Sequence, residues 1–334
     1  MNRKIVIFLL AALLSTSALA GEFSKTGTAG AQFLKIGVGA RYNGLGEACV
    51  ATADDIYAMY WNPAGLTYIP GNEVAFTYVN YVADVSLNYV AFARNIHEIG
   101  VFGISATVLS MSDQEITTID EPDGTGLNYS VSSYALQFSY ARQLTVQFSF
   151  GGSFKYINER IYHEDARGFA FDFGTLLYTG YKSLRLGMNI SNMGPDMKFT
   201  GPDLDVSYDP DEGNPNQDPY ASNLNVDPYH LPLIFRVGMA YDFEFSNESK
   251  LVMSLEVKHP NDNEQQGAVG AEYNFQDKYF LRAGYKLNYD EENVGLGGGF
   301  RTSLSESTGL ILDYAWVDYG RFNSVHRFSA SITF

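Results

Sequence analysis

The sequence predicts an all-β protein, a transmembrane antiparallel β-barrel of about 14 strands with an N-terminal helical or irregular hatch in its lumen. Three observations support this fold class. In the last eight residues polar and apolar side chains alternate strictly, as in a strand between lipid and a hydrated lumen. Aromatic residues make up 15% of the chain, which fits the aromatic girdles of such barrels. The chain also begins with the pattern of an export signal.

Residues 1–20 are the predicted secretory signal peptide. Arg3 and Lys4 give a basic start, an apolar run follows from Ile5 to Leu14, and small residues precede a cleavage site after Ala20. The run is shorter than the roughly 20 residues that cross a bilayer as a helix, which argues against an N-terminal anchor. Together with the barrel pattern, this signal predicts the outer membrane of a Gram-negative-type cell.

Residues 21–72 are the predicted hatch or plug segment. They do not alternate as a strand, and two short helical pieces with glycine hinges fit them best. Asn62-Pro63 reads as a turn start with Pro63 at a first helical position. Gly37 and Gly39 lack the third glycine of a dinucleotide-binding fingerprint, so no cofactor is predicted.

Residues 73–334 are the predicted barrel, because period-two alternation persists almost to the chain end. The fourteen expected strands are 73–82, 85–94, 100–109, 130–141, 145–157, 168–178, 183–192, 233–245, 250–259, 268–275, 279–287, 294–304, 309–319 and 325–334. Links after even-numbered strands are short, whereas links after odd-numbered strands include the long segments 110–129, 158–167 and 193–232. A soluble sandwich has no reason to place its long loops at one end. The asymmetry therefore predicts periplasmic turns and a long external loop near 193–232.

Charged residues within the strands fall in phase with Gly, Ser and Asn and are assigned to the lumen, since a charge on the lipid face costs about 2 to 4 kcal/mol. The predicted lumen-facing charges are Arg185, Arg236, Asp242, Glu244, Glu256, Lys258, Glu272, Arg282, Lys286, Arg301, Asp313 and Arg327. Two interpretations remain open for this set. It is either a salt-bridge lattice that braces the wall or the lining of a solute path.

Composition argues against several other classes of function. Loss of Arg3 and Lys4 with the signal reduces the 22 basic residues to 20 against 38 acidic ones, a net charge of −18 that disfavours nucleic acid as a partner. Cys49 is the only cysteine in the sequence, which excludes an intramolecular disulfide. No catalytic Gly-x-Ser-x-Gly occurs, so the chain is not expected to be an enzyme.

No metal site is predicted either. The histidines show no metal-type spacing, and they are His97, His163, His230, His259 and His326. The acidic segment misses the EF-hand pattern, and a solvated loop is its preferred interpretation, with Ca²⁺ binding left open. Its carboxylates are Asp203, Asp205, Asp209, Asp211, Glu212 and Asp218.

Several motifs of residues 40–66 resemble the N-terminal signature of the PorV/PorQ family, which belongs to the FadL-like outer-membrane barrels. They are Ala40-Arg41, Gly44-Leu45-Gly46-Glu47-Ala48, Ala53-Asp54-Asp55 and Trp61-Asn62-Pro63-Ala64-Gly65-Leu66. Gly194-Pro195 and Leu231-Pro232 are similar to the family's long-loop borders. The resemblance implies fourteen strands and a lumenal hatch that contains Asp54, Asp55, Trp61, Asn62, Pro63, Ala64 and Gly65. A role confined to capping and turning a buried helix stays open for these residues.

The resemblance implies a component of the type IX secretion system, which would engage a secretion translocon and secreted cargo proteins. The alternative is a FadL-like passive transporter of a hydrophobic small molecule. A polar lumen and a long acidic loop favour the partner role. Further expected partners are outer-membrane lipids and the barrel assembly machinery, which would read the lipid face of the terminal strand at Phe328, Ile332 and Phe334.

Overall fold

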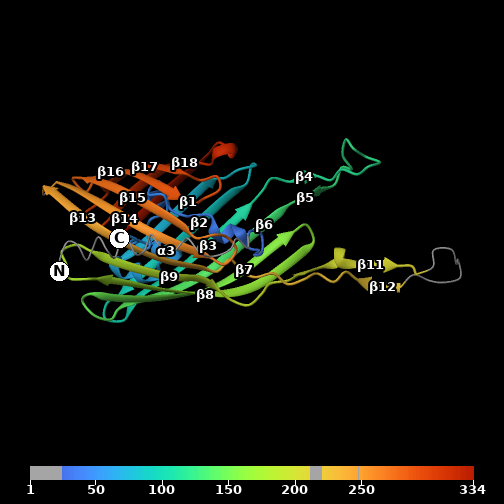
Figure 1. Ribbon diagram of the computed structural model, residues 1–334, viewed down its shortest axis with the longest axis horizontal. Helices are drawn as coiled ribbons and strands as arrows, with labels where there is room; N and C mark the ends of the chain where they lie inside the picture. The colour runs from blue at the N-terminus through green and yellow to red at the C-terminus, as the bar shows by residue number, and fades with distance from the viewer. Residues whose placement is uncertain (1–24, 211–219, 247) are drawn as a thin grey trace, which may run out of the picture.

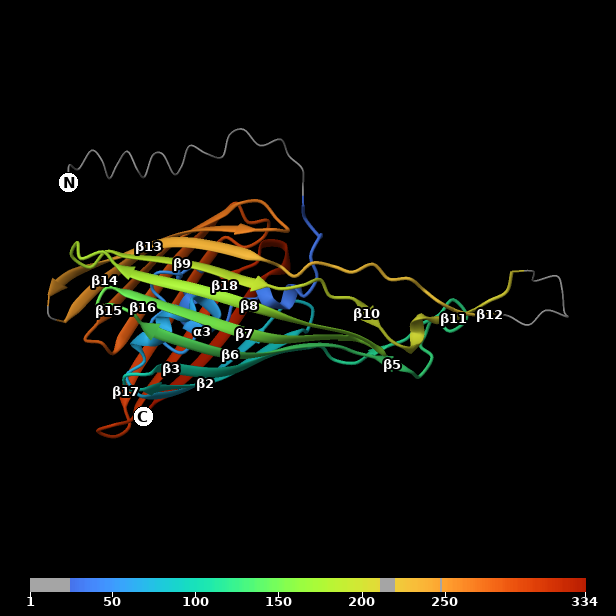
Figure 2. The ribbon, with the colours of Figure 1, turned by 90° about the horizontal axis from the view of Figure 1, so that it is seen from below.

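The computed structural model describes residues 25–210, 220–246 and 248–334, and its fourteen wall strands form a closed antiparallel barrel (Figures 1 and 2). The wall strands are β1 (Asn72–Asn80), β2 (Ser86–Ile96), β3 (Gly100–Ser110), β6 (Val131–Gln143), β7 (Phe148–Ile161), β8 (Glu164–Tyr178), β9 (Arg185–Met193), β13 (Ile234–Ser246), β14 (Ser249–Pro260), β15 (Gln266–Phe275), β16 (Tyr279–Leu287), β17 (Val294–Ser303), β18 (Gly309–Asp318) and β19 (Ser324–Thr333). The predicted fold class and strand number are confirmed.

The barrel closes where the first strand meets the last. β1 pairs with β19 from Glu73↔Thr333 to Asn80↔His326, and the remaining neighbours follow in chain order around the wall. Along β1 the small residue Ala75 is buried while its neighbours Val74 and Phe76 are exposed. This alternation places one face of each strand toward lipid and the other toward the lumen.

The two ends of the barrel differ. We call the end that contains Asn72 and Phe334, with short connections, the turn end, and the opposite end the loop end. At the loop end, β4 (Gln114–Glu115) pairs with β5 (Asn128–Tyr129), and β11 (Asp205–Tyr208) pairs with β12 (Tyr220–Asn223). β10 (Phe199–Thr200) pairs with β8, and η3 (Pro202–Leu204) and η4 (Gly320–Phe322) lie in the same set of loops. Both hairpins project well beyond the barrel in the same direction (Figures 1 and 2).

The prediction of a long loop over residues 158–167 is wrong. β7 and β8 continue to a tight turn at Tyr162 and His163, paired as far as Ile161↔Glu164. The apolar face of an outer-membrane strand is needed only where lipid covers it. Beyond that band the backbone ladder continues with polar residues on both faces, and the alternation that marks a strand in sequence is lost.

The segment before β1 lies inside the barrel as four short helical pieces rather than the two expected: η1 (Gln32–Lys35), α2 (Ala40–Gly44), α3 (Ala58–Trp61) and η2 (Pro63–Tyr68). Within the described part of the chain, none of the helices is long and apolar enough to span a bilayer. The main buried core cluster joins α2, α3 and η2 to inward-facing residues of β1 and β2, such as Ala75 and Tyr89, whereas the buried residues of η1 belong to a second cluster. We call residues 31–70 the hatch.

Candidate functional site: the plugged lumen

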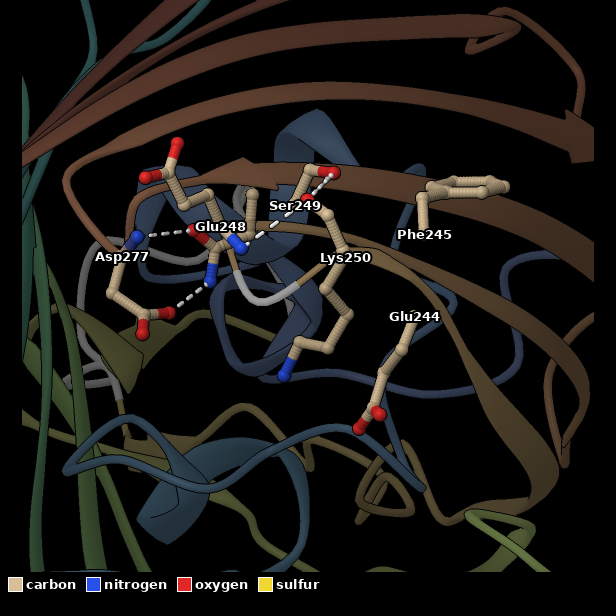
Figure 3. Close-up of a pocket in the computed structure, with 8 residues that line it drawn as sticks. Glu244, Phe245, Glu248, Ser249, Lys250 and Asp277 are labelled. Carbon is tan, nitrogen blue, oxygen red and sulfur yellow. Dashed lines mark hydrogen bonds between the residues drawn. The ribbon is translucent and has the colours of Figure 1, made fainter.

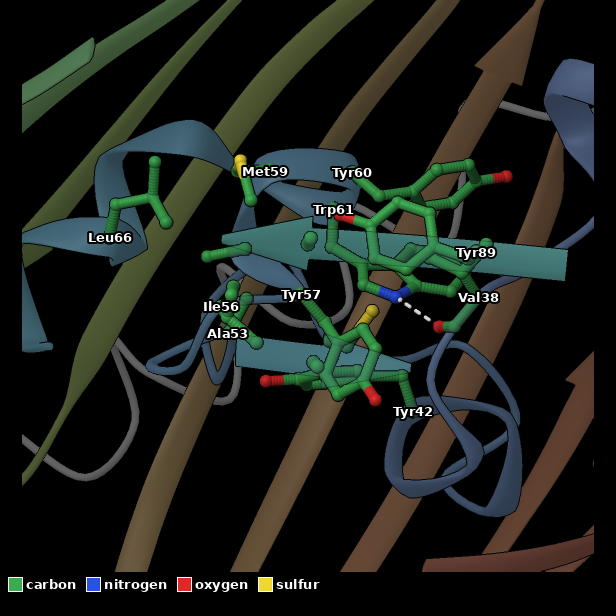
Figure 4. Packing of buried hydrophobic residues seen from close by; sticks show 14 of the residues in the cluster. Val38, Tyr42, Ala53, Ile56, Tyr57, Met59, Tyr60, Trp61, Leu66 and Tyr89 are labelled. Carbon is green, nitrogen blue, oxygen red and sulfur yellow. Dashed lines mark hydrogen bonds between the residues drawn. The ribbon is translucent and has the colours of Figure 1, made fainter. Parts of the chain in front are cut away.

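An aromatic cluster forms the centre of the hatch. The Trp61 indole N–H donates to the Val38 carbonyl at 2.9 Å, and its ring packs edge-on against Tyr60 with centroids 4.8 Å apart (Figure 4). Tyr42 lies 6.0 Å from the Trp61 ring and 6.3 Å from Tyr57. The Arg236 guanidinium of β13 lies 5.5 Å from the Trp61 ring, so the cluster contacts the wall as well as itself.

Asn62 holds the next part of the motif in place. Its side-chain oxygen accepts from the Ala64 N–H, so it caps η2, whose first residue is Pro63 as the sequence predicted. Its amide donates to the Val50 carbonyl of the hatch at 2.7 Å and to the Thr175 carbonyl of β8 at 3.0 Å. Asn62 therefore ties two parts of the hatch to each other and to the wall. The motif glycine that follows, Gly65, has no room for a side chain because it faces the Ala53 carbonyl.

The hatch packs closely against a set of glycines in the barrel wall. A methyl group added to any of them would meet a hatch atom at less than ordinary contact distance. This glycine belt consists of Gly103, Gly151, Gly174, Gly187, Gly238, Gly270, Gly284 and Gly295. At Gly284 and Gly270 the obstructing atoms belong to the Leu45 backbone, and at Gly151 to the Pro63 and Ala64 backbone.

The belt is continuous over much of the wall because its members face one another across strand pairs. They pair as Gly151↔Gly174, Gly187↔Gly238, Gly270↔Gly284 and Gly284↔Gly295. Close approach of another backbone is a recognised reason for glycine inside a strand. The hatch backbone thus packs directly on the wall at Gly151, Gly187, Gly270, Gly284 and Gly295, whereas hatch side chains, those of Asn62 and Val50, fill the space at Gly174 and Gly238.

Buried charges tie the hatch to the wall at three places. Arg41 pairs with Glu272 of β15 at 3.0 Å and also with the motif residues Asp54 at 2.5 Å and Asp55 at 3.2 Å. Glu47 pairs with Lys286 of β16 at 2.8 Å. The third tie runs from wall to hatch: a Glu256 carboxylate oxygen accepts the backbone N–H groups of residues 49 and 50 at 2.8 and 2.7 Å.

The Glu47 tether stays ionised inside the barrel. Burial by itself would raise the pKa of Glu47, but the ammonium groups of Lys286 and Lys258 lower that pKa to about 2. The Lys258 ammonium lies 3.8 Å from the carboxylate, and the Tyr289 ring lies within 5.0 Å of both lysines. The sequence motif contains Arg41 and Glu47 but gives no indication of their partners on the wall.

The structure brings most predicted lumen-facing charges together in pairs. Arg282 contacts Glu272 at 2.6 Å and Asp313 at 2.5 Å, Arg236 lies 3.6 Å from Glu256, and Arg185 pairs with Asp242. Arg327 is fully buried and donates to the Tyr319 hydroxyl at 2.8 Å. Two positions lie apart from these pairs: Arg301 and Glu244 are exposed near the turn end. Arg301 packs on the Phe280 ring there, 5.3 Å from its centroid.

The lumen contains cavities on both sides of the hatch. A cavity of about 540 Å³ opens toward the loop end between η1 and the loops, with Phe33, Ile36, Tyr81 and Phe322 among its apolar residues. Cavities of about 640 and 440 Å³ lie at the turn end, and the rim of the larger one carries several carboxylates (Figure 3). Among the described residues, no group of His, Cys, Asp and Glu is arranged to hold a metal ion.

The terminal strand presents the three predicted assembly residues to the lipid face. Phe328, Ile332 and Phe334 are 52%, 39% and 52% exposed. The acidic loop residues behave differently from one another: Asp203 pairs with His163 at 3.1 Å and Asp205 accepts from Asn223 at 2.8 Å. Asp211, Glu212 and Asp218 lie outside the described residues.

Comparison with known proteins adds a family and a fold. The family model described as type IX secretion system protein PorV matches residues 20–205. The monoaromatic hydrocarbon channel CymD aligns over 90% of this chain and 98% of its own with 14% identity and a TM-score of 0.57.

The Ralstonia pickettii toluene transporter TbuX, 14% identical, covers 89% of this chain and 98% of its own with a TM-score of 0.56. The Pseudomonas putida toluene transporter TodX, 13% identical, covers 89% and 97% with a TM-score of 0.56. At these identities the likeness establishes the barrel fold alone. No curated protein sequence matches the chain.

Proposed function

We propose, from the premise that this chain belongs to the PorV family of outer-membrane β-barrels, that it works in type IX secretion by binding protein partners at its loop end. The observation that carries the proposal is the plugged lumen. The hatch backbone packs on the glycine belt and is tethered to the wall by buried charges. A barrel filled in this way is better suited to presenting a surface than to passing a solute.

The loop end supplies the surface. Outer-membrane barrels have short periplasmic turns and longer extracellular loops, so we orient the loop end outward. Residues 111–130 contain five carboxylates and no Lys or Arg, and residues 194–233 contain eight carboxylates and one Lys. Such a field favours a partner with a basic face, because complementary charge steers association and suppresses wrong pairings.

Part of this loop surface is fixed to the barrel. β10 pairs with β8 at Phe199↔Ala166, and the Tyr229 hydroxyl donates to Glu159 of β7 at 2.8 Å. The residue just before the hatch joins the same assembly, since the Gly30 N–H donates to the His230 carbonyl at 2.9 Å. A surface held at several points loses less conformational freedom on binding than a free loop.

Affinity capture from native membranes tests the proposal. The intact protein should co-purify with an identified translocon barrel or secreted cargo. Replacement of residues 205–223, the β11–β12 hairpin, with a short Gly-Ser linker should abolish that capture and leave the barrel heat-modifiable. As a matched control, replacement of the turn-end residues Ser305–Ser307 should leave capture unchanged. Retained capture after loss of the hairpin would contradict a binding role for it.

Passive transport of a hydrophobic compound is the second candidate function. The loop-end cavity, with its aromatic and aliphatic lining, favours it, as do the toluene transporters among the structural neighbours. Uptake of toluene into liposomes that contain the protein, together with no captured secretion partner, would support transport over the partner role. No uptake above protein-free liposomes, with capture intact, would eliminate transport.

A further inference from the structure

A groove interrupts the lipid face of the wall. It has a volume of about 560 Å³ and crosses strands β17, β18, β19 and β1. Its floor lies at the outward-facing positions Gly298 and Ala330, which carry no side chain and a small one. Phe300, Leu312 and Phe328 stand around this floor and are 40%, 47% and 52% exposed. The groove therefore exists because two small residues lie among large apolar ones.

The groove is apolar because the polar residues of the same strands face the lumen. Asp313 pairs with Arg282 at 2.5 Å, and the Ser329 hydroxyl lies 3.0 Å from that of Thr77 inside the barrel. The side chains that meet the bilayer here are thus apolar apart from the Tyr314 hydroxyl. Dispersion attraction falls steeply when a gap opens between surfaces, so the groove gains most contacts when a chain enters it. In the hydrocarbon layer of a membrane that chain is an acyl chain.

A polar cluster lies at the loop-end side of the groove. The Tyr314 hydroxyl is 2.8 Å from His326 Nδ1, and His326 Nε2 is 3.3 Å from Ser324 Oγ. His326 is flanked across the strand pairs by Trp316 and Asn80. Within the described parts of the chain, the side chains of Trp316 and Asn80 have no hydrogen-bond partner, so their donors stay available. We call these five residues the head cluster.

The head cluster is suited to an uncharged headgroup. None of its members is a Lys or Arg, the residues that recognise anionic lipids. Asp318, which is paired with Ser324 across β18 and β19, adds a negative charge that disfavours a phosphate beside it. The hydroxyl groups of a sugar both donate and accept hydrogen bonds, which matches hydroxyl, imidazole and amide side chains. The Trp316 ring adds a flat apolar face against which a sugar ring can pack.

We propose that this face of the barrel holds one molecule of a glycolipid, with an acyl chain in the groove and a sugar headgroup on the head cluster. Tyr314 belongs to both parts, because its ring lines the groove and its hydroxyl contacts His326. With the loop end outward, as proposed above, the site lies in the outer leaflet. The inference uses that orientation but not the identity of any secretion partner.

The test uses the full-length protein in phosphatidylcholine nanodiscs that contain a photoactivatable glucosyl diacylglycerol, with a diazirine on its acyl chain. Mass spectrometry of the cross-linked protein locates the chain, and we expect cross-links at residues 298–300, 312–314 and 328–330. Unlabelled glucosyl diacylglycerol should compete for these cross-links at a concentration about tenfold lower than phosphatidylglycerol with the same acyl chains, because only the sugar satisfies the head cluster.

Three variants separate the two parts of the site. G298L fills the floor without a clash, since a methyl group added there has its nearest contact at 3.9 Å, and it should reduce the cross-links about fivefold. G152L is the matched control at a lipid-face glycine of β7, where the nearest contact is 3.6 Å, and should change them less than about twofold. H326F keeps a ring beside Tyr314 but removes its hydrogen bonds. It should abolish the preference for the sugar lipid and leave the cross-links in place.

Cross-links spread evenly over the lipid face, or a G298L protein labelled as strongly as the parent, would refute the groove. Equal competition by the two lipids in the parent protein would refute a sugar headgroup. All variants should remain heat-modifiable, so that a lost cross-link is not mistaken for a lost barrel. Secretion partners take no part in this assay. Loss of loop-end capture with unchanged cross-linking would therefore count against the proposed function alone.

Discussion

At the scale of single residues, Glu47 shows how the hatch is held. Its carboxylate neutralises Lys286 and Lys258 inside the barrel, and its side chain is 8% exposed. Since Lys286 also pairs with Glu292, removal of the Glu47 charge would leave Lys258 as the uncompensated cation. Removing one partner of a buried ion pair lowers folding stability by about 3 to 5 kcal/mol, whereas an exposed ion pair contributes about 1 kcal/mol or less.

We therefore expect E47Q to lower the unfolding free energy by about 3 kcal/mol at neutral pH. The folded pKa of about 2 lies below the ordinary value for a glutamate, so this stabilisation is complete above the unfolded pKa and is lost as the pH falls toward 2. Thermal unfolding of both proteins as a function of pH would measure the difference. It should be constant above about pH 5 and shrink at lower pH.

Glu291 provides the control, because its partner Arg321 is 84% exposed. E291Q should leave stability nearly unchanged, because an exposed ion pair contributes little to it. A gap between E47Q and the parent protein that stays constant down to the lowest accessible pH would contradict the assignment of the stabilisation to the ionised Glu47.

Gly151 and its neighbour Gly152 test the glycine belt within a single strand. A side chain at Gly151 would overlap the Pro63 backbone, whereas at Gly152 the nearest atom beyond the chain neighbours lies 3.6 Å away, an ordinary contact. G151V should displace the hatch and raise the single-channel conductance in planar bilayers above the near-zero value that we expect for the parent protein. G152V should remain closed, and equal conductance of both variants would argue against the belt.

At the scale of elements, the closing strand carries the assembly prediction. The Phe334 carbonyl accepts the Asn72 N–H at 2.9 Å, and the Phe334 N–H donates to the Asn72 carbonyl at 3.0 Å. Deletion of Phe334 removes this last rung and one side chain of the lipid face. The amount of heat-modifiable barrel in outer-membrane fractions should fall, while F300L, a change on the lipid face of β17, should have no effect. Unchanged yield without Phe334 would contradict a role in assembly.

Strand length varies around the wall. β6, β7 and β8 have 13, 14 and 15 residues, whereas β1, β9 and β16 have 9 each. The three long strands rise toward the loop end, where β10 adds to the edge of β8. The long strands thus provide a rigid base for the acidic loops. A strand that ended at the membrane surface would not provide such a base.

For the whole molecule, orientation is the first property to test. In a C49A background, S222C at the loop end and S305C at the turn end should differ in intact cells. A membrane-impermeant maleimide should label S222C and leave S305C unlabelled until the outer membrane is opened. Cys49 is 1% exposed and is therefore a poor target for the reagent. Its replacement ensures that any labelling comes from the introduced cysteine. The opposite labelling pattern would invert the proposed orientation of the barrel.

The sequence by itself determined the wall. Alternation has a period of two in any strand with lipid on one side, so fourteen segments, the buried phase of residues such as Arg236 and Lys286, and the lipid-facing Phe328 could be read directly. The turn at Asn62-Pro63 was equally readable, because capping and the fixed backbone of proline are local properties.

Only the tertiary structure decided what fills the barrel and how far its strands extend. Glu47 and Lys286 are 239 positions apart, and pairing at such a separation leaves no local pattern in the sequence. The belt glycines carry no side chain to signal their partner, so their role is visible only once the hatch backbone is placed against them. The ends of β7 and β8 leave no pattern in the sequence for a related reason: beyond the lipid the wall needs no apolar face, and the two strands stay paired as far as Ile161↔Glu164 without it.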